Sequence, residues 1–219
     1  MIAGIDEAGR GPLLGPLVVA GVLIDSDKPL KKIKVRDSKQ LTPQRREDLA
    51  TQIRALAHKI EYVIIPATDI DRLRQTKTIN QIEVDAFAAI IDRLQPATCY
   101  VDAADVIEDR FGTAITKTLT TCHPIIVSKH KGDSLFPVCS AASILAKVTR
   151  DYHVRLIEQE LQEHLAMPLG SGYQTDPDTM TFLRAWLKQY HTFPTCVRRT
   201  WESSRLLMQD HLTKKLDEF

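Results

Sequence analysis

The stretch Met1-Ile-Ala-Gly-Ile-Asp-Glu-Ala-Gly-Arg-Gly-Pro-Leu-Leu-Gly-Pro-Leu-Val-Val-Ala-Gly-Val-Leu-Ile24 opens the chain. A short apolar strand ends at two adjacent carboxylates, Asp6 and Glu7, and the apolar run Leu17 to Ile24 is typical of a second strand. Acids at the end of a buried strand are costly unless a cation or hydrogen bonds compensate them. Between the two strands, the turn Gly9-Arg10-Gly11 suits the close approach of a phosphate backbone. The stretch therefore indicates a metal-dependent site for phosphodiesters.

Strands and helices alternate along the rest of the chain. Apolar periodicity and the helix start signal Thr42-Pro43 predict helices at about 43–58, 78–94, 106–120 and 138–163, and strands at 61–65, 99–101 and 124–127. This order predicts an α/β fold, a mixed central sheet flanked by helices. The break at Gly170-Ser-Gly172 predicts a main domain over 1–170 and a helical C-terminal segment over 171–219, packed beside the active site.

Composition sets limits on location and on binding. The 219 residues carry a formal net charge of +1, so any affinity for nucleic acid must come from local patches. The four cysteines form no Cys-x-x-Cys pair, which disfavours a disulfide framework and a zinc knuckle. Since the chain starts directly in a strand and has no long apolar segment, we expect a cytoplasmic protein without an export signal or a membrane span.

Four acids lie at the ends of predicted strands or in loops beside them: Asp6, Glu7, Asp102 and Asp133. Hard oxygen ligands suit Mg²⁺ or Mn²⁺ better than zinc. Two such ions roughly 3.5–4 Å apart can promote an in-line displacement at phosphorus. An isolated strand-end Asp is commonly a turn or cap residue, and periodicity alone does not choose Asp102 over the nearby Asp105.

The glycine-rich turn has a competing interpretation as a dinucleotide-binding fingerprint. The spacing Gly9-x-Gly11-x-x-x-Gly15 misses G-x-G-x-x-G by one residue, and a strand follows it instead of a helix. No helix N-terminus is then available for a pyrophosphate. We reject this interpretation.

Several blocks of the sequence resemble type 2 ribonuclease H in its archaeal form. The blocks occur in the family's order over nearly the whole chain: Gly4-Ile-Asp-Glu-Ala-Gly-Arg-Gly-Pro12, Asp37-Ser38-Lys39-x-Leu41, Asp102-Ala-Ala-Asp105, Lys129-His-Lys-x-Asp133, Pro137-Val-x-Ser-Ala-Ala-Ser-Ile-Leu-Ala-Lys-Val-Thr-Arg-Asp151, and Gly170-Ser-Gly-Tyr173 with Asp176-Pro177. The resemblance implies a ribonuclease H-like fold. It also implies endonucleolytic cleavage of RNA in RNA–DNA hybrids, and incision at ribonucleotides embedded in duplex DNA, leaving 3′-hydroxyl and 5′-phosphate ends.

The resemblance also assigns roles to residues. It implies that the four acids are the metal-binding and catalytic residues and favours Asp102 over Asp105. Only the 2′-hydroxyl distinguishes RNA from DNA at one nucleotide, and the family reads it mainly with backbone groups of its glycine-arginine-glycine turn and with a tyrosine at the sugar. The implied substrate-binding residues are Gly9, Arg10, Gly11 and Tyr173 for the ribose, and Lys39, Ser140, Ser143 and Lys147 for phosphates.

Some assignments stay open at the level of sequence. His130 either assists proton transfer or product release, or is an ordinary loop histidine. The end of the chain, Leu216-Asp217-Glu218-Phe219, resembles the core of a sliding-clamp binding peptide, but Thr213 replaces its glutamine and the second aromatic is absent. An amphipathic tail that folds onto the protein is the alternative.

Two other functions compete with a monomeric ribonuclease. One is a nucleic-acid-binding protein of the same fold that has lost catalysis, which the presence of all four acids disfavours. The other is a different nuclease or recombinase, which need not carry the glycine-arginine-glycine turn.

Overall fold

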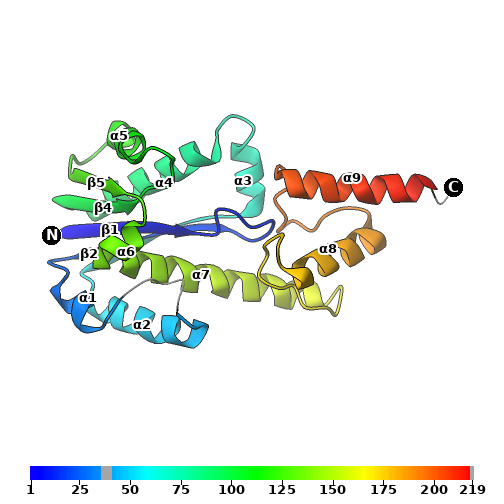
Figure 1. Cartoon of the computed structure of the whole chain (residues 1–219), viewed down its shortest axis with the longest axis horizontal. Coiled ribbons are helices and arrows are strands. Elements are labelled where there is room, and N and C mark those ends of the chain that lie inside the picture. Colours follow the sequence, from blue (N-terminus) through cyan, green and yellow to red (C-terminus); the bar gives the residue numbers. More distant parts are fainter. Residues whose placement is uncertain (36–40, 218–219) are drawn as a thin grey trace. The chain divides into compact units, whose positions relative to one another are not determined.

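The computed structural model describes residues 1–35 and 41–217 (Figure 1). Lys39, a predicted phosphate-contacting residue, lies outside the described residues. The chain divides into two compact units: Met1–Ala8, Val18–Ile64 and Lys77–Thr149 form the first, and Gly9–Leu17, Ile65–Thr76 and Arg150–Phe219 form the second. The expected boundary at residue 170 falls inside the second unit and stays a prediction.

A five-stranded mixed sheet forms the centre of the first unit. The strands lie in the order β3-β2-β1-β4-β5, with bounds β1 Ile2–Ala8, β2 Leu17–Ile24, β3 Lys59–Ile65, β4 Thr98–Asp102 and β5 Ile125–Lys129. Strand β1 pairs antiparallel with β2 and parallel with β4, and β4 pairs parallel with β5. The predicted α/β fold with a mixed sheet is therefore confirmed.

Helices cover both faces of this sheet. Figure 1 shows α4 (Ile79–Leu94) and α5 (Glu108–Thr118) on one face, and α2 (Pro43–Leu56) with the start of α7 (Pro137–Gln162) on the other. The shorter helices of the first unit are α1 (Lys28–Lys32) and α6 (Gly132–Leu135). The predicted start of α2 is correct, because the Thr42 side chain accepts a hydrogen bond from Arg45 N.

One close approach joins the sheet to α7 within the first unit. A Cβ added at Gly4 of β1 would lie 2.3 Å from the backbone carbon of Val138. Only glycine leaves room for the helix backbone at this distance. The first turns of α7 therefore pass directly over β1, next to Asp6 two residues further along the strand.

The second unit is helical and has its own apolar core. It contains α3 (Ala67–Leu73), the later part of α7, α8 (Pro177–Tyr190) and α9 (Glu202–Asp217). Leu169, Phe182, Leu183 and Leu187 are among the residues buried in this core. The helical C-terminal segment predicted from the sequence is confirmed, whereas α3 was not predicted. In the part of the chain that the structure describes, no helix is both long and apolar enough to cross a membrane.

Candidate active site

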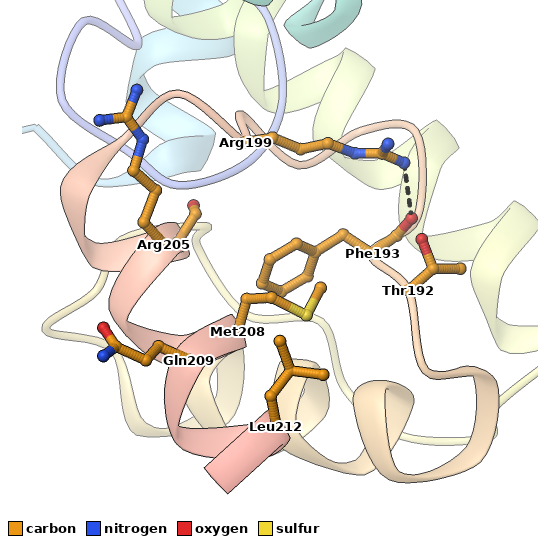
Figure 2. Close-up of a pocket in the computed structure, with 8 residues that line it drawn as sticks. Thr192, Phe193, Arg199, Arg205, Met208, Gln209 and Leu212 are labelled. Atoms are coloured by element: carbon orange, nitrogen blue, oxygen red, sulfur yellow. Dashed lines mark hydrogen bonds between the residues drawn. The ribbon is translucent and has the colours of Figure 1, made fainter.

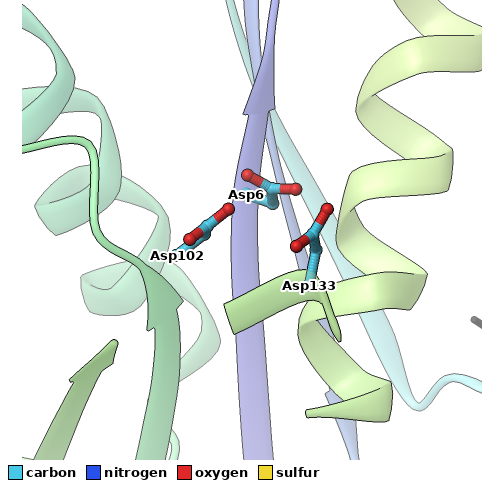
Figure 3. A group of neighbouring side chains, drawn as sticks. All are labelled: Asp6, Asp102 and Asp133. Atoms are coloured by element: carbon cyan, nitrogen blue, oxygen red, sulfur yellow. The ribbon is translucent and has the colours of Figure 1, made fainter. Parts of the chain in front are cut away.

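Three of the four predicted carboxylates come together in the first unit. Asp6, Asp102 and Asp133 each offer a carboxylate oxygen, and these oxygens all lie within 4.8 Å of one another (Figure 3). Ile5 and Val101 are paired in the parallel β1–β4 register, so the next residues, Asp6 and Asp102, sit at neighbouring positions. Segments separated by about a hundred residues in sequence thus supply one cluster.

The short helix α6, which follows β5, holds Asp133 against the end of β4. Gly132 N donates a hydrogen bond to Asp102 Oδ1 at 3.0 Å. A Cβ at Gly132 would lie 3.0 Å from both Asp102 Cα and Val101 O, so the start of α6 packs closely on the strand end. Asp133, the next residue, is buried with only 3% of its surface exposed. The position of Asp133 is therefore set by backbone packing.

Glu7 is not part of this group of three. It follows Asp6 on β1, and successive side chains of a strand point to opposite faces of the sheet. Its role as a metal ligand stays a prediction.

Asp6 occupies an environment that opposes its negative charge. The pKa of Asp6 is raised from 3.8 to about 6, and burial is the largest cause. The positive charge of Lys147 lowers this pKa, and the negative charge of Asp102 raises it. Hydrogen bonds from Ser143 and from Glu7 N, the latter at 2.8 Å, also favour the ionised form. A bound divalent cation would offset the remaining cost of holding these carboxylates together. The three carboxylates therefore fit such an ion, and their oxygens are the ligands that Mg²⁺ and Mn²⁺ prefer.

Asp6→Asn is expected to stabilise the metal-free protein at neutral pH. Since the pKa of Asp6 in the folded state, about 6, lies above the ordinary value of 3.8, folding takes up a proton between these values. Above about pH 6 the ionised carboxylate then costs on the order of 3 kcal/mol of unfolding free energy, and this cost shrinks as the pH falls toward 4. Urea unfolding in EDTA should show a larger gain at pH 7.5 than at pH 5. If the gain in unfolding free energy at pH 7.5 is equal to or smaller than the gain at pH 5, the raised pKa of Asp6 is not its cause.

The predicted phosphate-contacting residues of α7 lie near Asp6. Lys147 Nζ donates to Ser143 Oγ at 2.5 Å, and Ser143 in turn bonds to Asp6. Ser140, one turn earlier, is buried, and its Oγ has no hydrogen-bond partner among the described residues. The structure thus gives Ser143 and Lys147 contacts toward the carboxylates, while their role toward phosphate stays a prediction, as does that of Lys39.

Asp105 and His130, whose roles the sequence left open, take part in local structure. Asp105 forms an ion pair with Arg110 and accepts a hydrogen bond from Ile107 N, and the Arg110 guanidinium lowers its pKa to about 2. His130 donates its backbone N–H to Glu108 Oε1 at 2.6 Å, and its Nε2 lies 3.2 Å from Val106 O. Asp105 therefore stabilises the turn that leads into α5 and is not part of the carboxylate group.

The second unit brings the glycine-arginine-glycine turn and Tyr173 together. A Cβ at Gly11 would lie 3.9 Å from Tyr173 Cε1, and Leu13 N donates to Gly172 O at 2.7 Å. Gly9 adopts φ +86°, and a Cβ there would lie 2.5 Å from Pro16 O, so the turn requires glycine at this position. The two elements that the resemblance links to the ribose are thus neighbours.

Two buried arginines beside this turn were not predicted as site residues. Arg150 is 5% exposed and Arg198 is fully buried, and both donate to backbone carbonyls of the turn segment. Arg150 lies in the block that ends at Asp151, but the resemblance assigns it no role. No local motif marks Arg198, because its acceptors are more than 180 residues away in sequence. Only the tertiary structure identifies them.

Two pockets have different chemistry. In the first unit, Asp133 and the basic residues Lys31 and Lys34 line a pocket of about 360 Å³. In the second unit, a mainly apolar pocket of about 370 Å³ lies between α9 and residues 192–199 (Figure 2). Phe193, Met208 and Leu212 supply its apolar surface, and its described lining includes no acid. Only the first pocket shares a residue with the carboxylate group.

Comparison with known proteins decides the family. The family model described as ribonuclease HII matches residues 3–204. The chain belongs to the ribonuclease HII family. Ribonuclease HII of Pyrococcus furiosus is 43% identical over 226 residues, covering 100% of this chain and 97% of the relative.

Solved ribonuclease HII structures agree with this assignment. The ribonuclease H2 structure from Pyrococcus horikoshii matches with a TM-score of 0.87 and 38% identity, covering 96% of this chain and 98% of the other. A structure of the PCNA:RNase HII complex from Archaeoglobus fulgidus matches with a TM-score of 0.86 and 38% identity, covering 94% and 96%. The expected ribonuclease H-like fold is confirmed, as is the enzyme class, a ribonuclease H that hydrolyses RNA in RNA–DNA hybrids.

Proposed function

We propose that this ribonuclease HII cleaves RNA–DNA hybrids endonucleolytically, incises duplex DNA at embedded ribonucleotides, and leaves 3′-hydroxyl and 5′-phosphate ends. The observation that supports this most strongly is the convergence of three carboxylates, two of them deeply buried, with oxygens within 4.8 Å of one another. Such a site suits cations better than an uncharged ligand. We assign Asp6, Glu7, Asp102 and Asp133 as the catalytic carboxylates.

These carboxylates would hold two Mg²⁺ or Mn²⁺ ions. When bound, the ions would lower the pKa of the attacking water and stabilise the departing 3′-oxygen. The protein contributes orientation: Ser143 bonds to Asp6, Lys147 bonds to Ser143, and Gly132 N bonds to Asp102. Groups that are held in place before substrate arrives need little reorganisation during the reaction.

The substrate-binding residues divide into two sets. We assign Ser140, Ser143, Lys147 and Lys39 to phosphates, where positive charge and hydroxyl donors position the strand without reading its sequence. We assign Gly9, Arg10, Gly11 and Tyr173 to the ribose, where the 2′-hydroxyl distinguishes RNA from DNA. The proximity of Gly11 to Tyr173 supports the second set.

The chemistry of the product ends tests this mechanism. Attack by water, the route assigned here, leaves a 3′-hydroxyl that a DNA polymerase can extend. Attack by the neighbouring 2′-hydroxyl would instead leave a cyclic phosphate that cannot be extended. We expect extendable ends from a hybrid cleaved in Mg²⁺ and no cleavage in EDTA, and cyclic ends would contradict the assignment.

We also propose that the C-terminal tail binds a sliding clamp. The resemblance of Leu216-Asp217-Glu218-Phe219 to a clamp-binding core supports this, as does the solved Archaeoglobus fulgidus complex with PCNA. Deleting residues 216–219 is expected to abolish clamp binding in calorimetry and to leave hybrid cleavage without the clamp unchanged. Undiminished clamp binding by the shortened chain would contradict the proposal. Cytoplasmic location and a monomeric state stay predictions.

A further inference from the structure

Arg198 is a buried cation whose acceptors are carbonyl groups of the glycine-arginine-glycine turn. Its Nε donates to Gly15 O at 3.2 Å and its Nη1 to Arg10 O at 2.9 Å. Its Nη2 donates to both Gly9 O and Gly15 O. The planar guanidinium fork thus contacts three carbonyls at the two ends of one short turn.

The turn carbonyls compensate the buried positive charge of Arg198. Its side chain is fully buried, and among the described residues it forms no ion pair with a carboxylate. The ring of Trp201 lies 4.9 Å from its Cζ. Burial lowers the pKa of Arg198 to about 9, so the guanidinium remains charged at neutral pH. A buried charge of this kind is costly unless hydrogen bonds compensate it, and the turn carbonyls supply them.

A second buried arginine, Arg150, also contacts this turn segment. Arg150 Nη2 donates to Ser171 O at 3.1 Å and lies 3.5 Å from Leu14 O. Its Cζ is 5.4 Å from the ring centroid of Tyr173. Arg150 therefore holds the turn segment and the segment that carries Tyr173 together, while Arg198 holds the carbonyls of the turn itself.

Peptide geometry links these carbonyls to the face of the turn that meets substrate. In a trans peptide, the C=O of one residue and the N–H of the next lie in one plane and point in opposite directions. The described residues contain no cis peptide bond. By fixing Gly9 O and Arg10 O, Arg198 therefore also fixes the N–H groups of Arg10 and Gly11, which point away from it.

We propose that Arg198 is a positioning residue for ribose selection, which aims the backbone N–H groups of Arg10 and Gly11 at the ribose. This inference rests on the proposed function, in which that turn reads the ribose through its backbone. Arg198 does not touch substrate and acts only through the turn. Its removal should therefore weaken cleavage at a ribonucleotide without altering the carboxylate site.

Arg198→Lys tests this inference, because lysine keeps the charge but lacks the fork that bridges three carbonyls. Arg199→Lys is the matched control, since Arg199 is exposed and its guanidinium donates to Phe193 O. We expect R198K to lower kcat/KM on a duplex with one ribonucleotide about 10- to 100-fold, as misplacement by about an ångström commonly does. The Mg²⁺ dependence of cleavage and the affinity for an all-DNA duplex should match those of the wild type and of R199K.

The outcomes separate the inference from the proposed function. If the wild type does not incise at the ribonucleotide, the proposed function fails. If the wild type incises and a folded R198K incises equally well, the inference alone fails. It also fails if R198K loses affinity for the all-DNA duplex by as large a factor as it loses kcat/KM at the ribonucleotide. If R198K does not fold, Trp201→Leu removes the ring beside the guanidinium and should give a smaller loss with the same selectivity. Wild-type cleavage by W201L would then overturn the inference.

Discussion

Asp102→Asn is expected to lower the rate of RNA–DNA hybrid cleavage by about 10³-fold or more, the scale of losing one group that stabilises developing charge. Asp102 is the last residue of β4, and its Oδ1 accepts from Gly132 N. The amide oxygen of asparagine can accept the same hydrogen bond, so the helix α6, which carries Asp133, should keep its position. The substitution removes the negative charge that the proposed cations require.

Asp105→Asn is the matched control for this prediction. Asp105 lies three residues further along the chain, where it pairs with Arg110 and accepts a hydrogen bond from Ile107 N. We expect D105N to cleave at nearly the wild-type rate and D102N to melt at nearly the wild-type temperature. Near-normal cleavage by D102N, or equal loss in both variants, would contradict the assignment of Asp102.

Gly4→Ala is expected to destabilise the protein by about 3 kcal/mol or more, at or above the upper end for an overpacked core. Its Cβ would lie 2.3 Å from Val138 C and 2.5 Å from Cys139 N, which are backbone atoms of α7. These atoms cannot move unless the helix moves. Because α7 also carries Ser143 and Lys147, a displaced helix should reduce cleavage as well as stability.

Gly21→Ala separates a backbone clash from a side-chain clash. A Cβ at Gly21 would lie 2.3 Å from Ile90 Cγ2 and 2.9 Å from Leu94 Cδ1. Both are side-chain atoms; Leu94 can change rotamer, and Ile90, which is stiff at χ1, can shift with α4 by less than a whole backbone segment must. We expect urea unfolding to show a smaller loss for G21A than for G4A. The opposite order would show that α7 adjusts more easily than the close approach at Gly4 implies.

The sequence was informative where local patterns determine structure. The apolar runs on either side of Gly9-Arg10-Gly11 predicted β1 and β2, and Thr42-Pro43 predicted the start of α2. Period and capping signals act over a few residues, so they can be read without tertiary information. The same patterns could not choose Asp102 over Asp105. That choice depends on the pairing of β4 with β1, which places Asp102 next to Asp6. It also depends on Arg110, which forms an ion pair with Asp105.

Contacts between distant segments could not be predicted from local patterns. Arg198 is in an ordinary polar stretch of the sequence, yet it is fully buried because carbonyls near the start of the chain surround it. Ser143 and Lys147, one helical turn apart, share a helix face, but their connection to Asp6 requires the close approach of α7 at Gly4. The contacts that the sequence did not predict are therefore those between residues that only the fold brings together.

Incision of a DNA duplex that contains one ribonucleotide tests the central claim most directly. The wild-type protein, Mg²⁺ and an end-labelled duplex are compared with the all-DNA duplex of the same sequence. The carboxylate group and the ribose-reading turn together predict a single cut at the ribonucleotide, no cut in all-DNA duplex, and none in EDTA. Equal cutting of both duplexes, or no cutting by folded protein in Mg²⁺, would contradict it.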